Sequence, residues 1–141
     1  MKTFTIYFLF FSVFIQTKII SSDIKITLKD LTNHKGFIHV ALFDDPGKFP
    51  KNNGKLLGLK KETQKAVREG IDIQDLQMGK YAIAIYHDEN NNGRFDTFLG
   101  LPREKYGFSN DARVFLGPPK FSEASFDLSD NINLEMEIIL R

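Results

Sequence analysis

The segment from Asp88 to Asp96 places oxygen-bearing side chains at alternate positions around a glycine. A calcium ion takes about six to eight oxygen ligands, and a calcium loop supplies them from its positions 1, 3, 5, 7 and 9, with a glycine for the sharp bend at position 6. Counted from Asp88, Gly93 falls at that bend. The spacing therefore predicts a calcium site whose ligands are Asp88, Asn90, Asn92, the backbone carbonyl of Arg94, and Asp96.

The predicted calcium loop lacks one ligand. A helix–loop–helix calcium site has a bidentate Glu at position 12, and this chain has Leu99 there. An acid from elsewhere is expected to complete the site, and the candidates are Glu89, Glu104, Asp111 and the Asp44-Asp45 pair. With so few charges, we expect a dissociation constant on the order of 10⁻⁵ to 10⁻³ M. The alternative is a metal-free turn, because Asn and Gly tolerate positive φ angles.

His87 adjoins the loop and is the one candidate for catalysis. It ends an apolar strand face that also carries Tyr81, Ile83 and Ile85. A small hydrolase or isomerase could use such a histidine with a nearby carboxylate, but a lone histidine on an apolar face is more often a core residue. The sequence has neither a nucleophile elbow nor a phosphate-binding or dinucleotide-binding glycine motif. We therefore expect a noncatalytic protein and keep His87 as the alternative.

The long segment after the loop is rich in Gly, Pro and aromatic residues. Connections of this length often carry function, so residues 98–111 are a candidate surface for a protein or carbohydrate ligand. The alternative is a small cluster packed beneath the loop. The residues proposed for this surface are Phe98, Arg103, Tyr106, Phe108 and Asn110.

Alternation of apolar and polar residues predicts the elements that position these side chains. Strands are expected over 23–29, 37–43, 71–74, 81–87, 121–128 and 132–141, the first two forming a hairpin. Residues 48–70 are expected to form an irregular crossover in which 59–69 is either a short helix or an edge strand. This pattern predicts an all-β fold, an antiparallel β-sandwich of about seven strands, immunoglobulin-like or prealbumin-like, with a long loop after its central strand.

The N-terminus has the order of a secretory signal peptide. Lys2 precedes an apolar run over 4–15, and polar and small residues follow to Ser22. We expect residues 1–22 to be removed, leaving 23–141 as a single secreted or periplasmic domain with no membrane span. The alternative is an uncleaved anchor, although a membrane-spanning helix needs roughly 20 apolar residues. The chain has no cysteine, which excludes disulfides and thiolate metal sites.

The charge balance argues against nucleic acid as a partner. The chain has 19 Lys and Arg against 18 Asp and Glu. Loss of residues 1–22 removes Lys2 and Lys18 and no acid, leaving 17 basic against 18 acidic residues, a formal charge of −1. Nucleic-acid binding requires a clear basic excess.

Residues 81–110 read Y-A-I-A-x-x-H-D-x-N-x-N-G-x-x-D followed by G-x-P-x-E-x-Y-G-F-S-N. This is the most specific of three segments that resemble a bacterial family known as domain of unknown function 2141. GFIHVALFDDPGKFP and PPKFSEASFDL also match, and Met78 departs from the family pattern, which has a small residue or Pro before the glycine. The resemblance implies a prealbumin-like or carboxypeptidase-regulatory-like β-sandwich at the bacterial cell envelope. It implies no activity.

Overall fold

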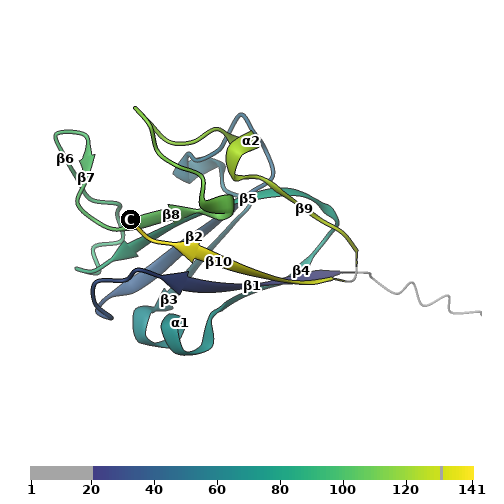
Figure 1. Ribbon diagram of the computed structural model, residues 1–141, viewed down its shortest axis with the longest axis horizontal. Coiled ribbons are helices and arrows are strands. Elements are labelled where there is room, and N and C mark those ends of the chain that lie inside the picture. The colour runs from purple at the N-terminus through teal and green to yellow at the C-terminus, as the bar shows by residue number, and fades with distance from the viewer. Residues whose placement is uncertain (1–20, 131) are drawn as a thin grey trace, which may run out of the picture.

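The described residues, 21–130 and 132–141 of a computed structural model, form an all-β sandwich with short helices at its ends (Figure 1). The predicted signal peptide lies, apart from its last two residues, outside the described residues. The strands are β1 (Ser22–Lys29), β2 (Phe37–Phe43), β3 (Leu57–Glu62), β4 (Ile71–Leu76), β5 (Gly79–Asp88), β6 (Thr97–Phe98), β7 (Leu101–Pro102), β8 (Tyr106–Phe108), β9 (Phe126–Leu128) and β10 (Asn133–Ile139). The helices are η1 (Asn52–Gly54), α1 (Thr63–Glu69), η2 (Ser109–Asp111) and α2 (Phe121–Ala124).

Two sheets form the layers of the sandwich. One has the strand order β10-β1-β4, and the other has the order β3-β2-β5-β8, with β9 also pairing with β5. Most pairs are antiparallel, as predicted, but β1 and β10 run parallel. β1 is therefore the middle strand of its sheet, with an edge strand on each side.

The core between the sheets follows from the alternation in the sequence. Residues that alternate along a strand point to opposite faces, so every second apolar side chain meets the facing sheet. Alternation along 132–141 predicts that Ile132, Leu134, Met136, Ile138 and Leu140 face inward. Ile138 and Leu140 are buried, whereas Ile132, just before β10, is 43% exposed. The core contains Ile24, Ile26, Ile38, Val40, Leu42, Ile71, Ile73, Tyr81, Ile83, Ile85, Ile138 and Leu140.

The outer face of the five-stranded sheet is partly covered as well. At one end, Phe43 and Ala82 pack beneath Phe49, Phe108 and the α2 helix. At the other end the same face carries the loop that follows β5. β5 is thus covered on both sides, which is why both of its faces are apolar over most of its length.

Three predictions about the elements need correction. β1 and β2 do not form a hairpin, because they belong to different sheets. Residues 59–69 contain both alternatives, the end of β3 and the helix α1, whose Ala66 packs in the core. Residues 121–128 are not one strand, since α2 precedes β9.

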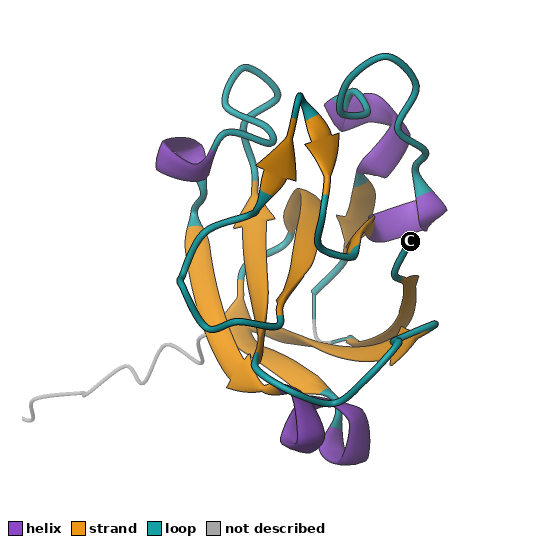
Figure 2. Ribbon diagram, turned by 90° about the vertical axis from the view of Figure 1, so that its left-hand side faces the viewer, coloured by secondary structure: helices purple, strands orange, loops and turns teal. Residues whose placement is uncertain are grey.

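The helix α1 and the β6–β7 hairpin lie at opposite ends of the sandwich. Figure 2 shows one helical segment, α1, below the sheets, while the short β6–β7 hairpin, several loops and the other helices lie at the upper end. Among the described residues, no helix is long and apolar enough to cross a membrane. The upper end therefore presents most of the irregular backbone of the molecule.

Candidate cation site at the end of β5

Asp88 fixes the start of the predicted cation loop. It is the last residue of β5, points to the outer face of the sheet and is fully buried. Its carboxylate accepts backbone N–H groups from Asn92 at 3.0 Å and Gly93 at 2.9 Å, and it lies 3.0 Å from Nε2 of His39. Burial raises the pKa of Asp88, but the hydrogen bonds from Gly93, His39 and Asn92 outweigh it, so that its pKa lies below the usual range.

The two loop asparagines hold the turn through their carbonyl oxygens. Oδ1 of Asn90 accepts the N–H of Asn92 at 3.0 Å, and Oδ1 of Asn92 accepts the N–H of Arg94 at 2.8 Å. Asn91 and Gly93 have positive φ angles of 57° and 75°. These bonds are those of ordinary Asn turns, and they are what the metal-free alternative predicts.

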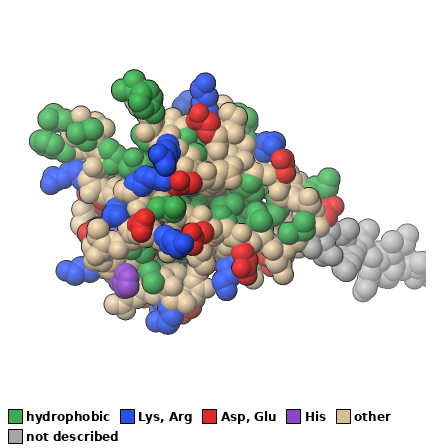
Figure 3. Space-filling view, in the orientation of Figure 1, with side chains coloured by type: hydrophobic (Ala, Val, Ile, Leu, Met, Phe, Trp, Pro, Cys, Tyr) green, Lys and Arg blue, Asp and Glu red, His purple; other side chains and the backbone are tan. Residues whose placement is uncertain are grey.

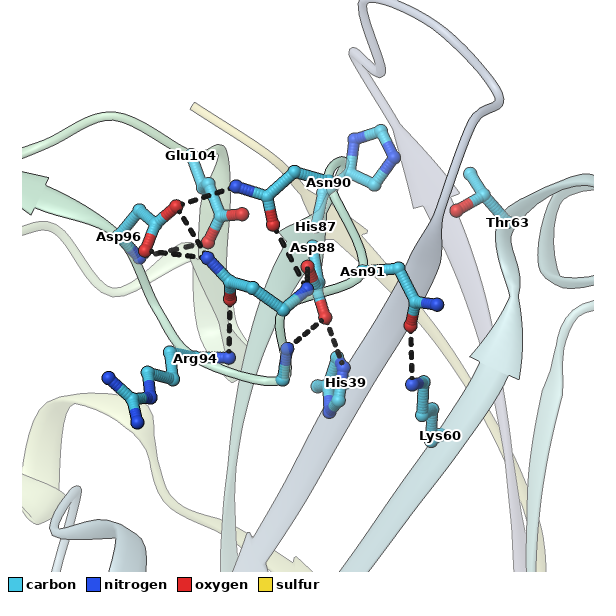
Figure 4. A network of polar contacts seen from close by, with 12 residues as sticks. His39, Lys60, Thr63, His87, Asp88, Asn90, Asn91, Arg94, Asp96 and Glu104 are labelled. Carbon is cyan, nitrogen blue, oxygen red and sulfur yellow. Dashed lines mark hydrogen bonds and ion pairs between the residues drawn. The ribbon is translucent and has the colours of Figure 1, made fainter.

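The amide nitrogens of the same asparagines converge on Asp96. Asn90 donates to Oδ2 of Asp96 at 2.8 Å, and Asn92 donates to both carboxylate oxygens at 3.0 and 2.9 Å. The backbone N–H of Asp96 donates in turn to Oε2 of Glu104 at 3.0 Å. Figure 4 shows the side chains of Asp96, Glu104 and Asn90 facing one another, while the Arg94 side chain points away. The structure thus brings the predicted side-chain ligands into one network.

Glu104 is the one candidate for the missing ligand that reaches this network. It is only 7% exposed, and its Oε1 atom is buried with no hydrogen-bond partner among the described residues. Burial raises the pKa of Glu104, and repulsion from Asp96 and Asp88 adds to the rise. The backbone N–H groups of Asp96 and Glu89 lower this pKa, but not enough to cancel the rise. No described Lys or Arg forms an ion pair with Asp96 or Glu104. The network therefore has more negative charge than its own donors neutralise.

Three of the other candidate ligands, Glu89, Asp111 and Asp45, are engaged elsewhere. Glu89 accepts hydrogen bonds from Thr32 and Asn33, in the turn between β1 and β2. Asp111 forms an ion pair with Arg141. Asp45 accepts the N–H of Gly47 and pairs with Lys48, and no hydrogen bond or ion pair connects it to the loop.

Within the described part of the chain, no three His, Cys, Asp or Glu side chains lie close enough together to hold a metal ion. A cation here would need amide and backbone oxygens as well as carboxylates, which calcium accepts. In the described conformation, Asn90 and Asn92 present nitrogen rather than oxygen to Asp96. Rotation of each amide by about 180° exchanges the two atoms. Binding therefore requires a local rearrangement of both side chains.

His87 does not have the surroundings of a catalytic histidine. It is fully buried, and its Nε2 lies 2.6 Å from the carbonyl oxygen of Lys35, which also accepts the hydroxyl of Thr63. Its Nδ1 lies 3.7 Å from Glu89. A ring enclosed in this way cannot contact a substrate, so the geometry does not support a hydrolase or isomerase that uses His87.

The sequence prediction did not include His39, which is the histidine in contact with the site. Pairing of β2 with β5 places His39 opposite Tyr86, and their rings stack with centroids 4.6 Å apart. Burial lowers the pKa of His39 despite its bond to Asp88, whose carboxylate lies within hydrogen-bond distance of Nε2. His39, Tyr86 and Lys60 line a shallow cleft of about 310 Å³ beside Gly93. The only sign in the sequence that an aromatic residue lies beside Asp88 was that Tyr86 and Asp88 share a strand face.

The predicted binding surface is only partly exposed. Phe98, Arg103 and Asn110 lie at the surface, and Tyr106 is half-buried. Phe108 is buried, with its ring 5.9 Å from that of Phe49, so its inclusion in the surface was wrong. Phe108 belongs to β8, whose pairing with β5 directs its side chain beneath α2.

The sequence comparison agrees with the resemblance noted above. The family described as "Uncharacterized protein conserved in bacteria (DUF2141)" matches residues 26–135. The chain belongs to this family. The match includes the whole cation loop and Glu104, so the site lies within the part that defines membership. Comparison with curated proteins and with solved structures gave no match. The prealbumin-like detail of the fold therefore stays a prediction.

Proposed function

We propose that this protein is a noncatalytic β-sandwich, secreted or periplasmic, that binds a calcium ion in the loop after β5. The ligands are Asp88, Asn90, Asn92, the Arg94 carbonyl and Asp96, completed by Glu104. The observation that carries the proposal is the buried, unpartnered Oε1 of Glu104 at the edge of the network. A carboxylate oxygen out of contact with water is costly unless it is paired, and a cation would pair it.

The cation would stabilise the β6–β7 hairpin, which follows the loop. Asp96 connects the loop to this segment, because its N–H donates to Glu104 and its carbonyl accepts the N–H of Arg103 at 2.9 Å. Those bonds close the base of the β6–β7 hairpin. An ion held by Asp96 and Glu104 would fix the hairpin as a surface for a protein or carbohydrate ligand at the cell envelope.

Calorimetric titration with calcium tests this proposal. We expect the wild-type chain to bind with a dissociation constant on the order of 10⁻⁵ to 10⁻³ M. Glu104→Gln keeps the size of the side chain but removes its charge, and we expect it to weaken binding by about tenfold or more, since a hard cation prefers carboxylate oxygen. Glu89→Gln is the matched control, because Glu89 faces Thr32 and Asn33 instead. Absence of binding by the wild-type chain at millimolar calcium would refute the proposal.

A metal-free envelope interaction module is the second candidate function. It is favoured by the two Asn carbonyls, which are already satisfied by the backbone of their own turn. In that case the loop needs no ion, and Glu104→Gln should leave the fold unchanged or stabilise it, because an uncharged amide costs less to bury than a carboxylate. The same titration separates the two candidates.

A further inference from the structure

Two loops at the upper end of the molecule carry the same short motif, F-L-G-x-P. One copy is the turn of the β6–β7 hairpin, over 98–102, and the other lies between η2 and α2, over 115–119. Both expose their large apolar side chains, with Phe98 at 61%, Leu99 at 88% and Leu101 at 70% in the first copy, and Phe115 at 86% and Leu116 at 97% in the second. Isolated exposed apolar residues are common, but protruding groups of large ones mark an interaction site.

The backbone at both tips is unfavourable for the residue it carries. Leu99 has a φ of 50° and Leu116 a φ of 55°, in the left-handed region. A branched side chain there is costly, and a two-residue hairpin turn with positive φ at both central positions favours Asn-Gly. Leu99 and Gly100 occupy those positions, since Phe98 pairs with Leu101. Leucine neither favours the backbone conformation of these turns nor packs in the core, which indicates that its exposure is functional.

Basic side chains accompany both tips. Residues 97–103 contain Arg103 and no acid, and residues 112–120 contain Arg113 and Lys120 and no acid. The Arg103 guanidinium lies 5.8 Å from the centre of the Phe98 ring. Figure 3 shows two groups of hydrophobic side chains projecting from the upper left of the molecule, with Lys or Arg side chains beside them. Apolar tips flanked by cations match the two layers of an anionic membrane surface.

We infer that the two F-L-G-x-P tips insert into the interface of an anionic phospholipid membrane, with Arg103 and Arg113 binding the headgroup phosphates. A bilayer accepts two separate protruding tips, whereas a protein partner with a dry core would need one contiguous patch. The inference rests on one part of the proposed function, the use of the segment after β5 as a binding surface, and it assigns a lipid surface to the tips in place of a protein or carbohydrate ligand. It does not depend on the cation, because both tips are already exposed.

Vesicle co-sedimentation of the full chain tests the inference. The vesicles contain phosphatidylcholine alone or with phosphatidylglycerol, and EDTA is present throughout. We expect binding to the anionic vesicles and, because each basic residue adds about 1 kcal/mol near an anionic surface, binding weaker by about fivefold for each of Arg103→Ala and Arg113→Ala. The double variant Leu99→Asn, Leu116→Asn should lose at least about tenfold in affinity. Its melting temperature should not fall, because Asn suits these turns better than Leu.

The matched control is Leu56→Asn with Met78→Asn, which changes two other exposed apolar residues and should bind like the wild type. All variants share one N-terminus, so differences between them do not come from residues 1–22. Absence of binding to anionic vesicles, or unchanged binding by the Leu99, Leu116 double variant, would overturn the inference. Neither result would change the conclusion drawn from the calcium titration. A titration without calcium binding would likewise not change the conclusion drawn from the vesicles.

Discussion

At the scale of single residues, the proposed ligands differ in whether they also shape the loop. Asp88 does so, because its carboxylate connects the loop backbone at Asn92 and Gly93 to His39 of β2. Its removal would disturb the loop with or without a metal. Asp96 and Glu104 carry the charge that the protein does not neutralise, so substitutions at these two residues report on the cation itself.

The spacing from Asp88 to Asp96 could be recognised in the sequence because those residues are neighbours along the chain. The sequence could not show that Glu104 rather than Glu89 reaches the loop. That choice depends on where β8 pairs with β5 and on the hydrogen bond from the N–H of Asp96. The bond between His39 and Asp88 is also non-local, as it requires the pairing of β2 with β5.

Gly36 gives a residue-scale prediction about how the site is positioned. Its φ is 67°, and a Cβ atom there would lie 2.0 Å from the carbonyl oxygen of Asp88. Gly36→Ala should therefore push the turn away from the end of β5 and destabilise the fold by about 3 kcal/mol or more, measured by urea unfolding. Gly100→Ala is the control, with a φ of 80° and no atom within 4 Å of the added Cβ, and should cost only about 1 to 2 kcal/mol. Equal losses would show that steric contact with Asp88 is unimportant.

At the scale of elements, alternation predicted which face of each strand is buried but not which strands pair. β1 and β2 follow one another with a short turn between them, a pattern typical of a hairpin, yet the turn carries the chain from one sheet to the other. Pairing depends on contacts between distant segments, such as β1 with β10. For α1 the sequence left a short helix and an edge strand as alternatives, because its seven residues are too few for a clear helical period.

Phe49 gives an element-scale prediction for the second cluster, which covers the outer face of β5. Its ring packs edge-on against Phe43, Phe108 and Phe121 at centroid distances of 5.2, 5.9 and 5.8 Å. Phe49→Ala should reduce the free energy of unfolding by about 3 to 5 kcal/mol, as for other buried phenylalanines. Phe115→Ala makes the same chemical change at an exposed tip and should alter stability by no more than about 0.5 kcal/mol. A small effect of Phe49→Ala would mean that the cluster is not a packed unit.

At the scale of the whole molecule, the sheets form a scaffold and the upper end carries the proposed binding features. The cation loop, the β6–β7 hairpin and the second F-L-G-x-P tip all emerge from or beside β5 and β8 (Figures 1 and 2). An ion bound to Asp96 and Glu104 would stabilise the base of the hairpin that carries the first tip. Cation binding and membrane binding are thus separate in their chemistry and adjacent in the structure.

Calcium should therefore stabilise the whole fold, since a ligand that binds only the folded state raises the free energy of unfolding. For a dissociation constant of about 10⁻⁵ M, calcium at about 1 mM adds about 2.7 kcal/mol, enough to raise the melting temperature of a domain this size by several degrees. Asp96→Asn removes the charge while keeping an oxygen, and we expect it to abolish most of the rise. Asp127→Asn is the control, because Asp127 lies in β9 and pairs with Lys80, away from the loop. A rise that persists in Asp96→Asn but disappears in Asp127→Asn would place the ion elsewhere, and no rise in the wild-type chain would favour the metal-free module.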